Sequence, residues 1–259
     1  MGIVNVTPDS FSDAGLYLDP EAAIAHGHEL VDEGADILDV GGESTRPGAA
    51  PVSADEEARR VIPVIERLAS DGARISIDTT KAAVARRALE AGATIVNDVA
   101  AFRFDPEIAA VTADAGAHCV LMHMLGEPRT MQDDPRYDEV VSDVKAFLEE
   151  RLAYAVAEGI PEDNIWLDPG IGFGKTLEHN LELIARLDEI VAIGRPVVFG
   201  ASRKSFLGKL TGRQVDERLS GTIAANIIAY ERGARVFRVH DVAPTVDALR
   251  VAAATVRRS

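Results

Sequence analysis

The sequence has little cysteine, few aromatic residues and no long apolar run, and each of these scarcities excludes a class of protein. Its single cysteine, Cys119, excludes a disulfide within the chain, which is typical of a reducing compartment; it lies in an apolar run, as a small core residue would. No stretch approaches the roughly 18 apolar residues of a membrane span. The first residues do not form a signal peptide. We therefore expect a cytoplasmic protein that does not enter membranes.

Positive charge is scarce as well. The 27 lysines and arginines are outnumbered by 42 aspartates and glutamates, which gives a formal net charge of −15. An acidic surface repels nucleic acids and anionic membranes, so we expect neither as a partner. The acidity is consistent with solubility or with a salty cytoplasm, and the basic residues of any anion site must act locally.

What the sequence does contain is a pattern that repeats at intervals of about 30 residues: a β-branched run, a polar loop and a helical stretch. The composition, 47% hydrophobic but only 5% aromatic, suits strands buried on both faces. Eight evenly spaced repeats without a linker predict one α/β domain over residues 1–259, a closed (β/α)8 TIM barrel rather than an open, doubly wound sheet. The predicted strands span residues 2–6, 36–40, 74–78, 94–98, 118–123, 164–168, 196–200 and 235–240.

Glycine marks the ends of several predicted helices. Gly34, Gly92, Gly116 and Gly233 are each followed by alanine, directly before or close to a predicted strand. A glycine just past the last turn adopts the left-handed conformation that ends a helix. These positions therefore support the predicted alternation of helices and strands.

Polar side chains stand where most of the predicted strands end. A purely structural strand avoids such residues, and one buried carboxylate could be an accident, but six strand ends together are not. Because the carboxyl ends of all strands meet at the same mouth of a barrel, we expect a catalytic site there. The residues concerned are Asn5, Glu43, Thr45, Arg46, Asp78, Asn97, Asp98, Asp168, Arg238 and His240.

Three of these residues, Asp78, Asn97 and Asp168, predict a site for a flat heterocycle. A carboxylate accepts two parallel N–H bonds from an aminopyrimidinone edge much as it does from arginine. The alternative is a divalent metal held by the same three side chains. No HxH or ExxH spacing lies at the predicted strand ends to supply further ligands for a metal, which favours the heterocycle.

A second group of residues predicts an anion site. Arg203 and Lys204 follow the seventh predicted strand in the segment GASRKSFLG, at the start of a helical turn whose N–H groups attract anions. Arg238 and His240 alternate along the last strand and so share a face, and Asn5 lies on the neighbouring first strand. These three form a cradle for a phosphate or diphosphate, with Mg²⁺ and the Asn5 amide oxygen as one of its ligands. The alternative for Arg203 is a solvated charge or an ion pair.

The segment DPGIGFGKT follows the sixth predicted strand. Its spacing matches neither GxxxxGK[ST] nor GxGxxG, so it is not a nucleotide loop. Gly170, Gly172 and Gly174 instead allow the backbone to approach a flat ligand, with Phe173 against the face of that ligand.

Two polar loops, TPDSFSDAG and GGESTRPGAAP, follow the first and second predicted strands. Loops of this composition commonly close over a barrel mouth and exclude water. In the first loop, Asp13 is an acid that could stabilise a developing cation. Phe11 in the same loop offers an apolar wall for a second, aromatic substrate.

Together these motifs closely resemble the bacterial dihydropteroate synthases. The resemblance is carried, in order, by NVTPDSFSD, GGESTRPGA, SIDTTK, NDV, LMHMLGEPRTMQ, DPGIGFGKT, GASRKSFLG and RVHDV, and it runs from Gly2 to about residue 250. It implies a (β/α)8 barrel, usually a homodimer, that is inhibited by sulfonamides. The implied reaction condenses 6-hydroxymethyl-7,8-dihydropterin diphosphate with 4-aminobenzoate in folate synthesis, and releases diphosphate.

The resemblance also implies a role for each residue. The pterin would be bound by Asp78, Asn97, Met122, Asp168, Phe173 and Lys204. The diphosphate would meet Asn5, Arg46, Arg238 and His240, with Mg²⁺ on Asn5. The aminobenzoate would lie near Phe11, Thr45, Pro47, Lys204 and Ser205. Catalysis, by diphosphate loss to a pterin cation and attack of the amine, would depend on Asp13, Lys204, Arg238 and His240.

Two other functions fit the same fold. A pterin-dependent methyltransferase domain shares the heterocycle site but needs no diphosphate cradle, and the SRK and RVH segments argue against it. A non-catalytic relative, acting as a binding or assembly partner, would have lost loop motifs such as STRPG or SRK, and this sequence keeps both.

Overall fold

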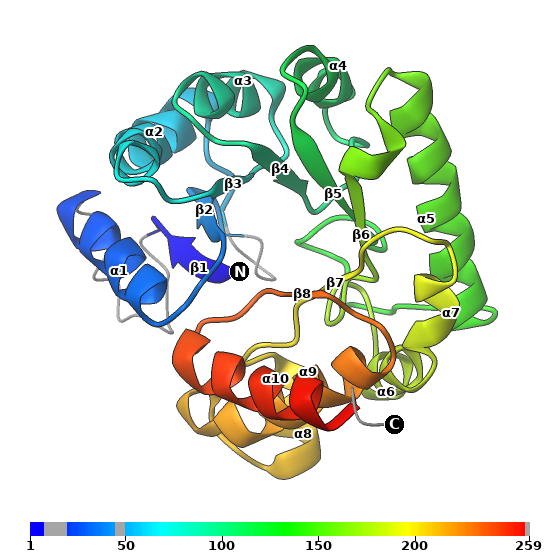
Figure 1. Ribbon diagram of the computed structural model, residues 1–259. Helices are drawn as coiled ribbons and strands as arrows, with labels where there is room; N and C mark the ends of the chain where they lie inside the picture. The colour runs from blue at the N-terminus through cyan, green and yellow to red at the C-terminus, as the bar shows by residue number, and fades with distance from the viewer. Residues whose placement is uncertain (8–19, 45–49, 257–259) are drawn as a thin grey trace.

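The computed structural model describes residues 1–7, 20–44 and 50–256. Its strands form a ring with the helices outside, as Figure 1 shows in a view into the barrel. Every predicted strand is present, although β7 and β8 are reduced to two residues each. The strands are β1 Gly2–Asn5, β2 Leu38–Gly41, β3 Ile75–Asp78, β4 Ile95–Asp98, β5 His118–Met122, β6 Ile165–Asp168, β7 Val198–Phe199 and β8 Val236–Phe237.

All neighbouring strands are parallel, and the ring is closed. Strands β1 to β6 pair in sequence order, and β7 pairs with β8. Single parallel bridges join the two groups, Leu167 to Val197 on one side and Gly2 to Val239 on the other. The backbone N–H of Ile3 donates to the carbonyl of Val239 at 3.1 Å across the second junction. The predicted closed barrel is therefore confirmed, and an open, doubly wound sheet is excluded.

In the part of the chain that the structure describes, ten α-helices surround the ring. The predicted glycines end four of them, because Gly34, Gly92, Gly116 and Gly233 all have φ between 62° and 110°. None of the helices in the described ranges is both long and apolar enough to span a bilayer. The helices are α1 Pro20–Asp32, α2 Ala54–Ser70, α3 Ala82–Glu90, α4 Glu107–Asp114, α5 Val140–Ala157, α6 Leu177–Ala185, α7 Leu187–Val191, α8 Ser205–Thr211, α9 Leu219–Glu231 and α10 Val242–Val256.

Alternation along the strands divides the core in two. Outward side chains, including fully buried Cys119, pack against the helices in one large cluster. Inward side chains at the amino-terminal end form a separate apolar layer of Ile37, Ile95, Val120, Trp166 and Val198. The next inward position toward the carboxyl ends carries mostly polar residues. The apolar layer therefore closes the base of the barrel and leaves the chemistry at its mouth.

We predict that Leu68→Ala in α2 destabilises the fold by about 2–5 kcal/mol, since the Leu68 side chain is fully buried between helices and sheet. The same substitution at Leu210 in α8, which is 57% exposed, is the matched control. Urea denaturation followed by circular dichroism measures both. Equal loss of stability in the two variants would contradict this description of the core.

Candidate functional site

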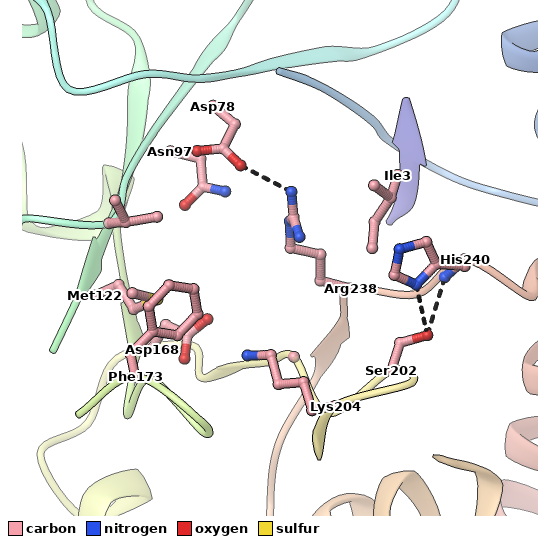
Figure 2. Close-up of a pocket in the computed structure, with 12 residues that line it drawn as sticks. Ile3, Asp78, Asn97, Met122, Asp168, Phe173, Ser202, Lys204, Arg238 and His240 are labelled. Atoms are coloured by element: carbon pink, nitrogen blue, oxygen red, sulfur yellow. Dashed lines mark hydrogen bonds and ion pairs between the residues drawn. The ribbon is translucent and has the colours of Figure 1, made fainter. Parts of the chain in front are cut away.

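A cavity opens at the carboxyl ends of the strands. Figure 2 shows the carboxylates and the amide of the cavity on one side, together with Met122 and Phe173, and the cationic side chains Arg238 and Lys204 facing them. The structure brings together residues from β3, β4, β5 and β6 and from the segments that follow β6, β7 and β8. The predicted residues that line the cavity are Asp78, Asn97, Met122, Asp168, Phe173, Lys204, Arg238 and His240.

A buried ion cluster lies on the β2–β3 side of the cavity. Arg238, directly after β8, donates through Nε to Asp39 Oδ2 at 2.6 Å and through Nη2 to Asp78 Oδ2 at 2.8 Å. Asn97 Nδ2 donates to the same Asp39 oxygen at 3.1 Å. The second oxygen, Asp39 Oδ1, is buried and has no hydrogen bond within the described residues. The cluster therefore connects β2, β3, β4 and the end of β8.

Asp39 was not among the predicted site residues, although the sequence holds a signal for it. It is an acid in the middle of an otherwise apolar strand, and it is fully buried. Alternation from Ile37, which lies in the apolar base layer, points Asp39 into the barrel. The prediction considered only the polar residues at strand ends and therefore missed Asp39, which lies in the middle of β2.

The cluster controls two charges. Burial would lower the pKa of Arg238, but Asp39 and Asp78 outweigh it and raise that pKa, so the guanidinium stays charged. Burial raises the pKa of Asp78 to about 7; Asp39 acts in the same direction and Arg238 opposes it. The Asp78 carboxyl therefore changes protonation near neutral pH, within reach of a ligand in the cavity.

On the β6–β7 side of the cavity lie Asp168, Lys204 and Phe173. Asp168 Oδ1 accepts from the Gly170 N–H at 2.7 Å, and burial raises the Asp168 pKa. Lys204 Nζ donates to the Ile171 carbonyl and lies 4.5 Å from the centre of the Phe173 ring. Burial lowers the pKa of Lys204 to about 8, with Asp168 opposing the shift. A carboxylate, an amine and an aromatic face thus converge on one space.

An apolar cluster completes this side of the cavity. Val99, Met122, Met124 and Met131 are buried together, and the Phe173 ring packs against them. Figure 2 shows Met122 and Phe173 side by side in front of Asp168. A flat ring can lie against such a wall while its polar edge meets the carboxylates.

The predicted anion site is only partly assembled. The Ser202 hydroxyl lies 2.9 Å from His240 Nδ1 and accepts from the His240 N–H at 3.2 Å, which fixes the imidazole at the cavity edge. Asn5 stands on the inward face of β1, two residues beyond Ile3, but is outside the cavity lining. Ser205 is exposed at the first turn of α8 and is also outside it.

Two polar residues near the mouth face elsewhere. Arg203 has φ +57° and forms an ion pair with Asp241 at 2.6 Å, which was the alternative to an anion contact. The carboxylate of Asp98 accepts from the N–H groups of Ala100 and Phe102, each at 2.7 Å, and does not line the cavity. The prediction that Asp98 lies in the barrel mouth is wrong. Neighbouring residues of a strand point to opposite faces of the sheet, and on β4 it is Asn97 that points into the barrel.

The glycines of DPGIGFGKT are required by protein neighbours rather than by a ligand, which corrects the prediction. Gly170 has φ +68°, and a Cβ there would lie 1.8 Å from the His123 carbonyl oxygen. Gly174 has φ +64°, and its Cβ would lie 2.7 Å from the Leu125 side chain. The loop after β6 is therefore pressed onto the segment after β5.

A second buried network lies at the base of the loop after β2. Lys81 Nζ donates to Glu43 and to fully buried Glu57, both at 2.6 Å. Glu43 Oε1 accepts from the Val52 N–H at 2.8 Å. The two ends of the loop are thus tied together, and neither Lys81 nor Glu57 was predicted from the sequence.

Some predicted residues and one alternative remain to be placed. Arg238 already engages Asp78, which argues against a metal held by Asp78, Asn97 and Asp168. The other predicted site residues lie outside the described residues: Phe11, Asp13, Thr45, Arg46 and Pro47.

Comparison with known proteins supports the resemblance found in the motifs. The dihydropteroate synthase of Escherichia coli K12 is 47% identical over 256 residues, which cover 98% of this chain and 90% of that protein. The crystal structure of Yersinia pestis dihydropteroate synthase with a sulfonamide drug has a TM-score of 0.96 at 43% identity, and the match covers 100% of this chain and 94% of that one.

The dihydropteroate synthase of Xanthomonas albilineans has been solved with both kinds of ligand. With 4-aminobenzoic acid the TM-score is 0.92 at 51% identity, and with 7,8-dihydropteroate it is 0.88 at 48% identity. Each match covers 98% of this chain and 92% of that one. A family model described as pterin binding enzyme matches residues 1–240. The chain therefore belongs to the pterin binding enzyme family.

Proposed function

We propose that this chain is a dihydropteroate synthase that joins 6-hydroxymethyl-7,8-dihydropterin diphosphate to 4-aminobenzoate and releases diphosphate. The observation that carries the proposal is the cavity itself. Acceptor side chains from β3, β4 and β6, with apolar side chains beside them, face the Lys204 amine and the Arg238 guanidinium. Relatives that carry this name have been solved with 4-aminobenzoic acid and with 7,8-dihydropteroate. The same site accounts for both substrates.

The carboxylate side of the cavity binds the pterin. Asp168 keeps one oxygen on the Gly170 N–H and presents the other to the amino and ring N–H donors of the pterin edge. Asn97 and Asp78 extend this set of acceptors, while Phe173 and Met122 lie along the faces of the ring. Lys204, between Asp168 and the Phe173 ring, meets the acceptor atoms of the same ligand.

The cationic side holds the leaving group. The bond between the pterin methylene carbon and the diphosphate oxygen breaks, and the electron pair departs with the diphosphate toward Arg238, His240 and the predicted Arg46. The positive charge spreads into the pterin ring, where Asp78, Asp168 and the predicted Asp13 stabilise it. The amine lone pair of aminobenzoate then forms the new C–N bond, and the nitrogen loses a proton.

Mg²⁺ fits this arrangement through Asn5. A single amide oxygen is a weak site alone, but Mg²⁺ commonly takes one or two protein oxygens and completes its shell with phosphate oxygens and water. When bound, Mg²⁺ neutralises charge on the leaving group.

The second substrate lies toward the mouth. Lys204 and the neighbouring Ser205 at the start of α8 meet the aminobenzoate, whose remaining contacts are the predicted ones to Phe11, Thr45 and Pro47. An arylamine is unprotonated at neutral pH, so position rather than base catalysis governs its attack. The homodimer and the cytoplasmic location that the sequence predicts belong to the same proposal.

The direct test mixes the purified chain with both substrates and Mg²⁺. We expect dihydropteroate, identified by mass, and diphosphate to appear in equal amounts, because one leaving group departs for each new C–N bond. A sulfonamide that competes with aminobenzoate is expected to slow both. Diphosphate release without aminobenzoate incorporation, or methyl transfer from methyltetrahydrofolate instead, would overturn the proposal.

Asp168→Asn is expected to weaken pterin binding by about 10- to 100-fold, since it removes a charged acceptor while an amide oxygen can still accept from the Gly170 N–H. The fold is expected to remain intact. Titration calorimetry with 6-hydroxymethylpterin measures the affinity, and Asp114→Asn, an exposed position on α4, is the control. Unchanged affinity in Asp168→Asn would show that this carboxylate does not bind the pterin.

Asn5→Ala is expected to raise the Mg²⁺ concentration needed for half-maximal rate by about tenfold or more, because a direct ligand is lost. Asn164→Ala, which lies just before β6 at the opposite end of the barrel, is the control. Initial rates across a Mg²⁺ titration give both values. Identical Mg²⁺ curves for the Asn5 and Asn164 variants would remove Asn5 from the metal site.

A further inference from the structure

The lysine of DPGIGFGKT has no part in the proposed reaction, yet it is buried beside the cavity. Lys175 is 3% exposed, and among the described residues no carboxylate forms an ion pair with it, although the charge of Asp168 opposes the effect of burial on its pKa. Its Nζ lies 2.9 Å from His123 Nδ1 and donates to the Phe173 carbonyl at 3.0 Å. Burial drives the Lys175 pKa well below its ordinary value and lowers that of His123 to about 2. The two partners of the amine are therefore a neutral imidazole and a backbone carbonyl.

We propose that Lys175 is a positioning residue for the pterin: it ties the loop after β6 to the end of β5 and so fixes the Phe173 ring against the cavity. This inference rests on the proposed function for the identity of the ligand. It adds a residue that does not line the cavity and that acts through Phe173.

The other contacts of this loop hold its flanks. Gln132 donates to the Gly172 carbonyl at 2.6 Å, and the Tyr137 hydroxyl donates to the Gly174 carbonyl at 2.7 Å. Among the described residues, Lys175 provides the side-chain donor to the carbonyl of Phe173 itself. His123, its second partner, is packed edge-on against Phe147 of α5 with ring centres 4.8 Å apart, which gives the amine a rigid anchor.

The Phe173 ring contacts both the methionine cluster and Lys204, so its position affects both. The ring packs against the methionine cluster and lies 4.5 Å from Lys204 Nζ. Lys204 in turn donates to the carbonyl of Ile171 in the same loop. A shift of the loop therefore moves the aromatic wall and the Lys204 amine together, and both face the pterin.

The hydrogen bonds of the Lys175 amine explain why an amine, rather than an apolar group, occupies this buried position. Burying an amine without a carboxylate disfavours folding, so an apolar residue of similar length would suit the core better. What the amine adds is two directed hydrogen bonds, one to each side of the junction between the loops. An apolar replacement is thus expected to spare the fold and loosen the ring.

Lys175→Met is expected to raise the KM for the pterin diphosphate about tenfold. The KM for aminobenzoate is expected to rise by a smaller factor, because among its proposed contacts only Lys204 touches this loop, through the Ile171 carbonyl. The control is Lys145→Met, in which a partly exposed lysine of α5 is changed in the same way. In a Phe173→Ala background, Lys175→Met is expected to add little, because it acts through that ring.

Three results would overturn the inference: an unchanged pterin KM, equal losses for both substrates, or full additivity with Phe173→Ala. His123→Phe, which keeps the ring packing but removes the acceptor, provides a second variant if Lys175→Met does not fold. It is expected to raise the pterin KM in the same direction by a smaller factor. Calorimetry with 6-hydroxymethylpterin gives the same comparison without turnover. Wild type that binds this pterin but forms no dihydropteroate would refute the proposed function and leave the role of Lys175 open to the binding test.

Discussion

Arg238 is held between Asp39 and Asp78 inside the barrel, and its charge also acts on the pKa values of Asp78, Asp168 and Lys204. Burying two carboxylates at this depth strongly disfavours folding unless a cation lies beside them. With Arg238 in place, Asp39 also accepts from Asn97 and fixes the amide that faces the ligand. The cluster thus prepares acceptors on one side of the cavity before any substrate arrives. Preorganised dipoles and charges of this kind are what a reaction through a cation requires.

The barrel can hold this buried ion cluster because its apolar base is separate from its polar mouth. Inward residues alternate with outward ones, so β4, β5 and β6 each place one residue in the apolar base layer and one in the cavity. The loop after β6 then depends on its neighbours: its glycines press onto the His123 and Leu125 segment, and buried Lys175 anchors it. Strand geometry fixes the carboxylates, while loop contacts fix the aromatic wall and Lys204.

Much of this could be predicted from the sequence, for physical reasons. β-branched runs at intervals of about 30 residues, together with the glycine-ended helices, indicate where the strands lie, so all eight strands were found. The strand-end rule found the cavity residues Asp78, Asn97, Asp168, Arg238 and His240. The pairings could not be predicted, because they join distant parts of the chain: Arg238 and Asp39 are 199 positions apart. Lys175 and Arg203 were judged by their neighbours in sequence, whereas their partners His123 and Asp241 come from the segments after other strands.

The central claim is that the carboxylates of this cavity bind the pterin and that the cations beside them receive the diphosphate. A crystal structure of the chain with a non-hydrolysable pterin diphosphate analogue and Mg²⁺ tests it most directly. The account predicts the pterin edge on Asp168 and Asn97, its ring against Phe173, and the diphosphate toward Arg238 and His240. A pterin bound outside this cavity, or one turned with its diphosphate toward Asp168, would contradict the account.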